Sequence, residues 1–276
     1  MTTDTNNKVE QIQHMLRQMG SLVVAYSGGI DSTLMLKIAH DTLGERALGI
    51  MAVSASLPEL EQQQAVDIAR GIGARLKLIH SDETSDERYL KNAPDRCYFC
   101  KSNVYDQMVA YAQEHGYTFI VDGTNADDQN DHRPGREAAR ERGVRSPLLE
   151  YGVTKKEIRQ LARAYGLPNW DKPAAACLAS RIPYGTMITI PMLSQIERAE
   201  LALREMGFVE FRVRHHDQIA RIEVEAADFP RLIDQREGIL AALKMLGYTY
   251  VTLDLAGFRS GSMNEVLLKN GKRKAA

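Results

Sequence analysis

The stretch LVVAYSGGIDST, residues 22–33, decides the fold class of this chain. Its first five residues form a short apolar run, which is typical of a strand buried in a parallel sheet. Two glycines follow, and the apolar residues Leu34, Leu36, Ile38 and Ala39 then recur at helical spacing. The stretch therefore predicts a strand, a glycine turn and a helix in direct succession.

The same alternation continues on both sides of this stretch. Apolar periodicity predicts strands at 47–54, 76–80 and 118–122, and helices at 9–19, 58–72, 102–115 and 154–166. Strands that alternate with helices in this way predict an α/β fold with a doubly wound, mostly parallel sheet.

The alternation stops in the segment DKPAAACLASRIPYG, residues 171–185, which contains two prolines. Beyond it the patterns predict helices at 193–206 and 229–246, and strands at 209–214, 220–224 and 248–255. This order of elements predicts a smaller α+β domain at the C-terminal end. We therefore expect two domains, residues 1–180 and residues 181–276.

Composition narrows the class of protein. The chain has 276 residues, of which 44% are hydrophobic and 26% charged, with a net charge of −1, as is usual for soluble globular proteins. The lack of a basic stripe argues against nucleic-acid binding, and no apolar run approaches the ~18 residues of a membrane span. The polar N-terminal segment has no signal-peptide core, and three cysteines do not make a disulfide framework. We expect a cytoplasmic protein with no membrane or nucleic-acid partner.

The glycine turn has the composition of a phosphate-binding loop. The backbone N–H groups of Gly28 and Gly29 can converge on an anion at the start of the following helix. Further donors are the hydroxyl groups of Ser27, Ser32 and Thr33. A carboxylate beside a phosphate repels it unless a cation lies between them, so we assign Asp31 to Mg²⁺. The structural alternative is a plain turn capped by Asp and Ser.

The loop differs from a GxxxxGK[ST] loop because no lysine follows the glycines. The pattern SGGxDS resembles the pyrophosphate loop of the N-type ATP pyrophosphatase superfamily. The resemblance implies that ATP is split between its α and β phosphates and that the loop holds the departing pyrophosphate. It also implies that the strand end at Ser54 meets the adenine. The loop after the strand 118–122 offers further nucleotide contacts, namely Gly123, Thr124 and Asn125. The structural alternative is a simple turn at the end of that strand.

Two of the three cysteines, Cys97 and Cys100, form a CxxC motif within PDRCYFCK, residues 94–101. Such a pair occurs in redox, zinc and iron–sulfur sites. A structural zinc site needs a fourth ligand, and no histidine lies at ligand spacing from a cysteine. Zinc and redox chemistry leave Cys177 without a role, whereas a 4Fe-4S cluster with one open iron uses all three thiolates. The residues alone leave the cluster, zinc or redox chemistry, and simple packing open.

Several motifs together resemble the LarE family of sulfur transferases. They are SGGIDSTL (27–34), NDHRPG (130–135), CLASRIPYG (177–185), RVRHHDQIARIE (212–223) and YVTLDLAGFRSGSMN (250–264). The resemblance implies that ATP adenylylates a carboxylate of pyridinium-3,5-biscarboxylic acid mononucleotide. The product is then a thiocarboxylate used in synthesis of the nickel-pincer nucleotide cofactor. It also implies an ATP-pyrophosphatase domain at 1–180 and a substrate-binding and oligomerisation domain at 181–276.

The family has two kinds of member, which differ in the source of the sulfur. In one, a lone cysteine at the position of Cys177 gives up its own sulfur. In the other, cysteines at the positions of Cys97 and Cys100 join it to hold a 4Fe-4S cluster that passes on a sulfide. This chain carries all three, so the resemblance implies the cluster-dependent kind, fed by a sulfide donor system.

The resemblance also implies roles for charged residues of the C-terminal part. Arg212 and Arg214 alternate on one face of a predicted strand, and with Arg259 they are implied to bind the substrate phosphate. The alternative is a solvated strand face paired with acidic residues such as Glu223. Ser180 and Arg181 are candidates to orient the substrate carboxylates beside Cys177. Glu200 matches a metal-contacting glutamate of relatives, although Arg231 stands where its acidic partner would be.

Two other functions share parts of this pattern. A tRNA thiolase of the same superfamily also combines the loop with three cysteines, but it usually carries a basic surface or extra zinc modules. An amide-forming ligase would leave the CxxC motif unexplained. LarE-like proteins form hexamers, so the resemblance also implies a homo-oligomer.

Overall fold

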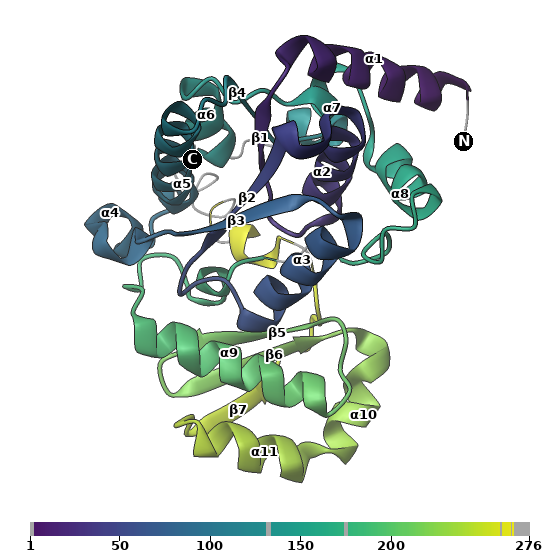
Figure 1. The fold of residues 1–276 in the computed structure, drawn as a ribbon. Coiled ribbons are helices and arrows are strands. Elements are labelled where there is room, and N and C mark those ends of the chain that lie inside the picture. Colours follow the sequence, from purple (N-terminus) through teal and green to yellow (C-terminus); the bar gives the residue numbers. More distant parts are fainter. Residues whose placement is uncertain (1–2, 131–133, 174–175, 260, 266, 268–276) are drawn as a thin grey trace, which may run out of the picture. The chain divides into compact units, whose positions relative to one another are not determined.

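The structure is a computed structural model that describes residues 3–130, 134–173, 176–259, 261–265 and 267 (Figure 1). The chain divides into two compact units. Unit 1 comprises Met1–Tyr89 and Pro94–Ala175, and unit 2 comprises Leu90–Ala93 and Ala176–Ala276. The short segment Leu90–Ala93 belongs to unit 2 because Asn92 bonds to the backbone there: its Nδ2 donates to the Pro183 carbonyl at 2.8 Å.

Unit 1 contains a four-stranded parallel sheet in the order β3-β2-β1-β4. Its strands are β1 (Leu22–Ala25), β2 (Ala47–Val53), β3 (Arg75–His80) and β4 (Phe119–Val121). Leu22, Val23 and Val24 of the central strand β1 have no exposed surface, because helices cover both faces of the sheet. The predicted doubly wound α/β fold is confirmed.

The helices of unit 1 form two layers, one on each face of the sheet (Figure 1). Leu22 and Val24 point into a core shared with α1 (Thr3–Met19), α2 (Ile30–Leu43), α3 (Glu59–Ile72) and α8 (Lys155–Ala164). Val23 points the other way, toward α5 (Arg96–Glu114) and α6 (Pro134–Glu141). The strand period of two therefore sends successive residues into different cores.

Strand order reverses between β1 and β4. The chain leaves β1 through α2 toward β2 on one side, while β4 pairs with β1 on the other, with Val24 opposite Val121. In an open α/β sheet such a reversal is the point where ligands bind, beyond the carboxyl ends of the strands. The fold thus brings the loops after β1 and β4 to one place.

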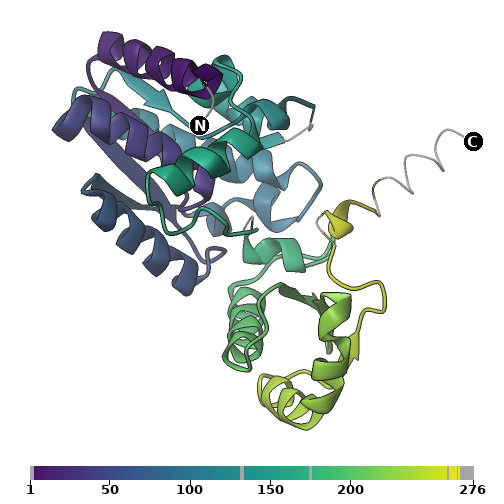
Figure 2. The ribbon, with the colours of Figure 1, turned by 90° about the vertical axis from the view of Figure 1, so that its right-hand side faces the viewer.

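Unit 2 contains a three-stranded sheet in the order β5-β6-β7, with helices gathered beside it (Figure 2). Its elements are the strands β5 (Phe211–His216), β6 (Ile219–Val224) and β7 (Tyr250–Leu253) and the helices α9 (Ile190–Glu205), α10 (Phe229–Asp234) and α11 (Arg236–Met245). Phe211 and Val213 of β5 and Ile222 of β6 pack against these helices in one core. By the same alternation, Arg212 and Arg214 lie on the opposite face of the sheet.

Some boundaries differ from the predicted ones. The helix expected at 229–246 is two helices, because Gln235 (φ −91°, ψ 9°) leaves the helical conformation between α10 and α11. The helix expected from 102 begins at Arg96, directly after Pro94-Asp95, a start signal that the apolar pattern overlooked. Both CxxC cysteines therefore lie inside α5. The segment 171–185 holds only one short element among its described residues, the 3₁₀ helix η4 (Leu178–Arg181).

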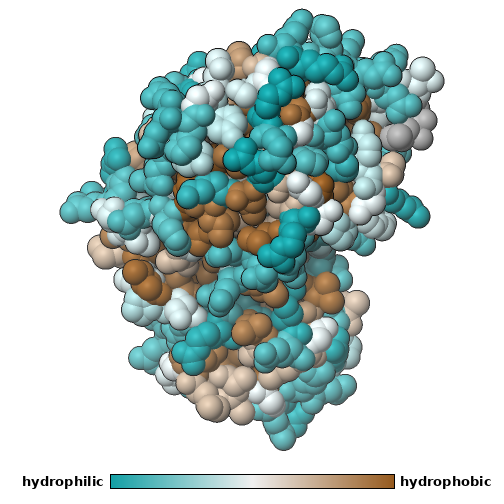
Figure 3. All heavy atoms as spheres, in the orientation of Figure 1, coloured by the Kyte–Doolittle hydropathy of each residue, from teal (hydrophilic) through white to brown (hydrophobic). Residues whose placement is uncertain are grey.

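Small elements complete the fold. They are α4 (Glu87–Leu90), α7 (Pro147–Glu150) and the 3₁₀ helices η1 (Gly44–Arg46), η2 (Glu83–Ser85), η3 (Ala126–Asn130), η5 (Ala226–Asp228) and η6 (Ser262–Asn264). Part of the motif at 130–135 lies outside the described residues. Within the described part of the chain, no helix has the length and apolar character needed to cross a bilayer. Much of the face in Figure 3 is hydrophilic, with smaller hydrophobic areas.

Candidate functional site

The glycine loop follows β1 and is shaped by its own hydroxyl groups. Ser32 Oγ accepts from the Ser27 backbone N–H at 3.1 Å and lies 3.0 Å from Ser27 Oγ. Gly28 has φ +75°, and a Cβ atom there would overlap Ala65 of α3. A glycine is needed at this position for both reasons. The loop is therefore held tightly against α3, with its backbone close to whatever it binds.

A distant lysine faces the acidic residue of the loop. Lys155, the first residue of α8, places its Nζ atom 2.7 Å from each carboxylate oxygen of Asp31. Its backbone N–H donates to Asp127 Oδ2 at 2.7 Å, which fixes the start of α8. The pair is partly accessible, with side-chain exposures of 34% for Lys155 and 28% for Asp31. The Asp31 carboxylate thus already faces a cation. A carboxylate that shares a site with phosphate needs one, because the two negative groups repel each other.

A buried asparagine holds the loop from behind. Asn169 is 3% exposed, and its Nδ2 donates to the Gly28 carbonyl and to Thr33 Oγ1, both at 3.0 Å. Thr33 itself has no exposed surface. Its hydroxyl group faces Asn169 inside the protein, so in this structure it supports the loop from within. No local pattern pointed to Asn169, which lies 141 residues from Gly28.

The loop after β4 packs directly on the glycine loop. A Cβ atom on Gly123 would lie 2.5 Å from the Ser32 backbone nitrogen, so only glycine fits without a shift. Asp122 accepts from the Thr124 N–H at 3.0 Å and from the Thr124 hydroxyl at 2.9 Å. Asn125 is 3% exposed, and its Oδ1 accepts from the Asp127 N–H at 3.0 Å.

Ser54 follows β2, the strand on the other side of β1. Its hydroxyl lies 3.0 Å from that of Ser56, which donates to the buried carboxylate of Glu83 at 2.7 Å. The predicted nucleotide residues of the loops at 27–33 and 122–125 are thus brought together, and Ser54 ends the adjoining strand.

Unit 2 has a cavity of about 220 Å³ rich in arginine. Its lining side chains come from η4, β5, β6 and the segment after β7; they include Ser180, Arg181, Arg214, His216, Arg221, Arg259 and Ser262. We call this cavity the arginine pocket. Burial and then the nearby charge of Arg221 lower the pKa of His216, so the positive charge of the pocket resides on the guanidinium groups.

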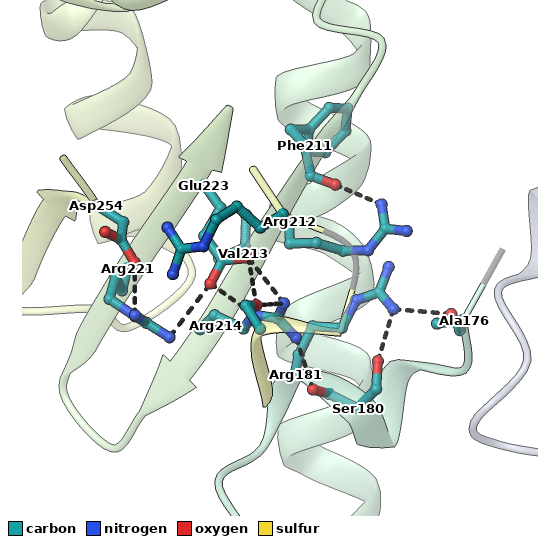
Figure 4. A network of polar contacts seen from close by, with 12 residues as sticks. Ala176, Ser180, Arg181, Phe211, Arg212, Val213, Arg214, Arg221, Glu223 and Asp254 are labelled. Carbon is teal, nitrogen blue, oxygen red and sulfur yellow. Dashed lines mark hydrogen bonds and ion pairs between the residues drawn. The ribbon is translucent and has the colours of Figure 1, made fainter. Parts of the chain in front are cut away.

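Two facing strands carry the arginines. Arg214 lies directly opposite Arg221 in the β5–β6 ladder, and like charges in that position repel. Glu223, which has no exposed surface, offsets this repulsion (Figure 4). Its oxygens accept from Arg214 Nε and Nη2 at 3.0 and 2.7 Å, and one lies 3.2 Å from Arg221 Nη2. Glu223 is thus an internal counterion that keeps these guanidinium groups on one face.

Arg212 lies on the same face of β5, and its positive charge is balanced less well than those of Arg214 and Arg221. Its Nη1 donates to the Phe211 carbonyl at 2.6 Å, and its guanidinium lies 5.0 Å from the centroid of the Phe258 ring. Burial, followed by the nearby charge of Arg181, lowers the pKa of Arg212 to about 10. Burial destabilises the charged form of the Arg212 guanidinium, and an anion placed beside it would stabilise that form again.

The third predicted arginine, Arg259, also lines the arginine pocket. It pairs with Glu265, whose Oε1 lies 3.0 Å from Arg259 Nη2. The structure therefore places Arg214 and Arg259 in one pocket and Arg212 on the same strand face as Arg214. Sequence reasoning missed Arg221 and His216, although the alternation along β5 and β6 could have pointed to both.

The predicted metal residue Glu200 and its neighbour Arg181 bond to each other. Arg181 Nε and Nη2 donate to the two carboxylate oxygens of Glu200, each at 2.9 Å. Arg231, at the position of the expected acidic partner, donates to the carbonyls of Met206 and Gly207. Both oxygens of Glu200 are thus used by protein donors in this structure.

The three cysteines occupy two environments. Cys97 is exposed and Cys100 half-buried, and their i, i+3 spacing in the first turns of α5 puts them on one side of that helix. Both belong to unit 1. Tyr105, followed by Cys100, raises the pKa of Lys101, so the ammonium group of Lys101 lies near the CxxC thiols.

Cys177 belongs to unit 2, where it is exposed and caps η4. Among the side chains that the structure describes, no three of the types His, Cys, Asp and Glu form a metal-binding group. Thiolates at a helix start and beside a cation are nevertheless donors of the chemistry that iron–sulfur clusters use.

Comparison with known proteins agrees with this arrangement. The chain is 40% identical over 92% of its length to pyridinium-3,5-bisthiocarboxylic acid mononucleotide synthase of Lactiplantibacillus plantarum, and covers 92% of that protein. It belongs to the LarE family.

Other LarE-like relatives are uncharacterized proteins. One from Synechocystis is 43% identical over 95% of this chain and 99% of its own length, and one from Methanocaldococcus jannaschii is 32% identical over 87% and 91%. A more distant relative, from the glutamine-hydrolyzing GMP synthase of Archaeoglobus fulgidus, is 23% identical over 88% of the chain and 78% of its own length, which fits the N-type ATP pyrophosphatase superfamily. No protein-family model matches the chain.

Proposed function

We propose that this protein uses ATP to convert a carboxylate of pyridinium-3,5-biscarboxylic acid mononucleotide into a thiocarboxylate, for nickel-pincer nucleotide synthesis. One observation carries the proposal. Cys177 caps the same short turn, η4, that contributes Ser180 and Arg181 to the arginine pocket. The thiol of Cys177 therefore belongs to the same unit and the same short turn as two residues that line this cavity. The named relative from L. plantarum supplies the identity of the substrate.

The first step would be adenylylation in unit 1. A carboxylate is a poor electrophile because its leaving group would be oxide. Attack of a carboxylate oxygen on the α-phosphorus of ATP breaks the α–β bridge, forms the acyl-adenylate and releases pyrophosphate. The N–H groups of Gly28 and Gly29 would hold that pyrophosphate, and Asp31, which already faces a cation, would hold Mg²⁺. Mg²⁺ supplies charge neutralisation there when bound.

The second group to be held is the phosphate of the mononucleotide. Arg212 and Arg214 lie on one strand face and Arg259 lines the adjacent pocket. Guanidinium groups suit a phosphate because they can donate two parallel hydrogen bonds. The lowered pKa of Arg212 supports this assignment, since a bound anion would stabilise the charged guanidinium that burial destabilises. We assign the substrate-binding role to unit 2 and the ATP-cleaving role to unit 1.

The sulfur would enter in a second substitution. Hydrosulfide attacks the activated carbonyl, AMP leaves, and the products are the thiocarboxylate, AMP and one proton. Cys97, Cys100 and Cys177 would hold a 4Fe-4S cluster, and the position of the first two on one side of α5, near Lys101, supports that role. When bound, this cluster supplies the sulfide. A cytoplasmic homo-oligomer, with a separate sulfide donor, completes the proposal.

The test is a single anaerobic reaction with ATP, the biscarboxylate mononucleotide and sulfide. We expect AMP, pyrophosphate and a product whose mass shows exchange of oxygen for sulfur. A reaction that consumes ATP with ammonia or glutamine, and forms an amide instead, would contradict the proposal.

A further inference from the structure

The side chain of Arg181 holds the turn that carries Cys177. Its Nη1 atom donates to the Ala176 carbonyl at 2.8 Å, to the Ser180 hydroxyl at 2.9 Å and to the Cys177 carbonyl at 3.2 Å (Figure 4). These three acceptors lie before, at and after the cysteine. The Arg181 side chain is only 4% exposed, so it is part of the interior of unit 2. One nitrogen atom thus fixes the backbone on both sides of the thiol.

The other edge of the same guanidinium is fixed by Glu200 of α9. Nε and Nη2 of Arg181 each donate to a different oxygen of Glu200, at 2.9 Å in both cases. This bidentate arrangement fixes direction as well as distance. The Cys177 turn is therefore tied to a helix of the unit 2 core and not merely to its own neighbours.

Glu200 also holds the strand that carries the phosphate-binding arginines. Its Oε1 accepts the backbone N–H of Val213 at 3.0 Å. Val213 stands between Arg212 and Arg214 on β5, an outer strand of the three-stranded sheet, so its N–H faces away from the ladder. A single carboxylate thus connects the turn of Cys177 to the strand of Arg212 and Arg214.

The hydrogen-bonding capacity of this pair is nearly all used within the protein. A guanidinium has five N–H groups. In Arg181, Nε and Nη2 each donate once and the two N–H groups of Nη1 are shared among three acceptors, so four of the five are used within the protein. Little donor capacity is left for a substrate carboxylate. Both oxygens of Glu200 are likewise used by protein donors in this structure.

We propose that the Arg181–Glu200 pair is a positioning device that sets Cys177 at a fixed place relative to the arginine pocket. The inference rests on the proposed role of Cys177 in sulfur delivery. Sulfur transfer requires the reacting atoms to be aligned within a few tenths of an ångström, and a misplacement of about 1 Å can cost on the order of a hundredfold in rate. An exposed cysteine on a short 3₁₀ turn does not reach that precision without an anchor.

Hydrogen exchange of the full-length chain tests the pair without substrate or ATP. The variants are Arg181→Lys, which keeps the charge but loses the fork, and Glu200→Gln, which keeps the shape but loses the charge. Two exposed residues of α9 provide matched controls, Arg198→Lys and Glu205→Gln. The reporter is a peptide covering 177–182, where the Ser180 N–H donates to the Cys177 carbonyl at 2.9 Å. A peptide covering β6 reports on the rest of unit 2.

We expect exchange in 177–182 to become about tenfold faster or more in both variants, the factor for losing one charge-assisted hydrogen bond. Exchange in β6 and in the controls should stay unchanged. Equally faster exchange across unit 2 would show that the pair only stabilises the unit as a whole. Unchanged exchange at 177–182 would show that the pair does not hold this turn. Either result overturns the inference.

Thiocarboxylate formation, measured separately, should fall at least tenfold in both variants if Cys177 takes part in sulfur delivery. A wild-type protein that forms no thiocarboxylate would instead refute the proposed function and leave the exchange result standing.

Discussion

Both carboxylate oxygens of Asp31 lie 2.7 Å from the Nζ atom of Lys155, although the two residues are 124 positions apart. Asp31 lies in the first turn of α2 and Lys155 begins α8, and these helices pack against each other in unit 1. The glycine loop has no lysine of its own. The fold supplies one from a distant helix, beside the loop that we propose holds the departing pyrophosphate.

We expect Asp31→Ala to abolish the cleavage of ATP to AMP and pyrophosphate and to leave the fold intact, because the side chain is partly exposed. Release of pyrophosphate and circular dichroism measure the two properties. Detection of ADP and orthophosphate as the main products in the wild-type protein would contradict cleavage between the α and β phosphates.

Lys155→Met should lower kcat/KM for ATP about ten- to a hundredfold, the value of one charge-assisted contact to phosphate. The next residue, Lys156, is exposed, so Lys156→Met is the matched control and should behave like the wild type. If both variants lose activity equally, the effect belongs to the net charge of α8 and not to the contact with Asp31.

Arg212→Ala should weaken binding of the mononucleotide about ten- to a hundredfold, since it removes a charge-assisted contact to its phosphate. Binding of ATP, measured by calorimetry on the same sample, should change little. Arg214→Lys tests the second arginine more safely than alanine, because Lys keeps a cation beside the buried carboxylate of Glu223. Equal losses for both ligands would show that these arginines do not bind the mononucleotide.

The sequence predicted those parts of the fold that depend on local patterns. The apolar run of β1, the glycine turn and the strand alternation of β5 and β6 are all short-range signals, and the first two point to the sheet of unit 1 and the third to that of unit 2. Contacts between distant segments left no such signal. Lys155, Asn169 and the pairing of Arg181 with Glu200 depend on how helices pack, which a single sequence does not report. The start of α5 was misplaced for a different reason: the helix begins at Arg96, directly after Pro94-Asp95, before the apolar pattern at 102–115 begins.

The pKa of Glu157 predicts how stability depends on pH. Although burial acts against it, the hydrogen bond from Lys8, then those from Thr154, lower this pKa to about 2 from its ordinary 4.5. The unfolded chain therefore binds a proton before the folded chain does. The stabilisation is complete above the unfolded pKa and is lost as the pH falls from about 4.5 toward 2. At neutral pH it is at most about 3 kcal/mol, because solvent screens the interaction.

Urea unfolding at several pH values tests this. Glu157→Gln should be less stable than the wild type at pH 7, and the difference should shrink steadily as the pH is lowered below 4.5. Glu10 on α1 is exposed, so Glu10→Gln should show no such change. A difference that is independent of pH would mean that Glu157 acts through packing and not through its charge.

Substitution of the three cysteines distinguishes between the two possible sources of sulfur. If Cys177 were a sacrificial donor, each chain would turn over once and lose the mass of one H₂S, and Cys97 and Cys100 would be dispensable. If the three thiolates hold a cluster, the chain remains chemically unchanged and acts repeatedly with added sulfide. Each of Cys97→Ser, Cys100→Ser and Cys177→Ser should then lose iron and sulfur transfer together. Adenylylation should survive, because the glycine loop does not involve these residues. Anaerobic turnover followed by intact-protein mass decides between them: dehydroalanine at position 177, with activity kept in Cys97→Ser, would establish the sacrificial route.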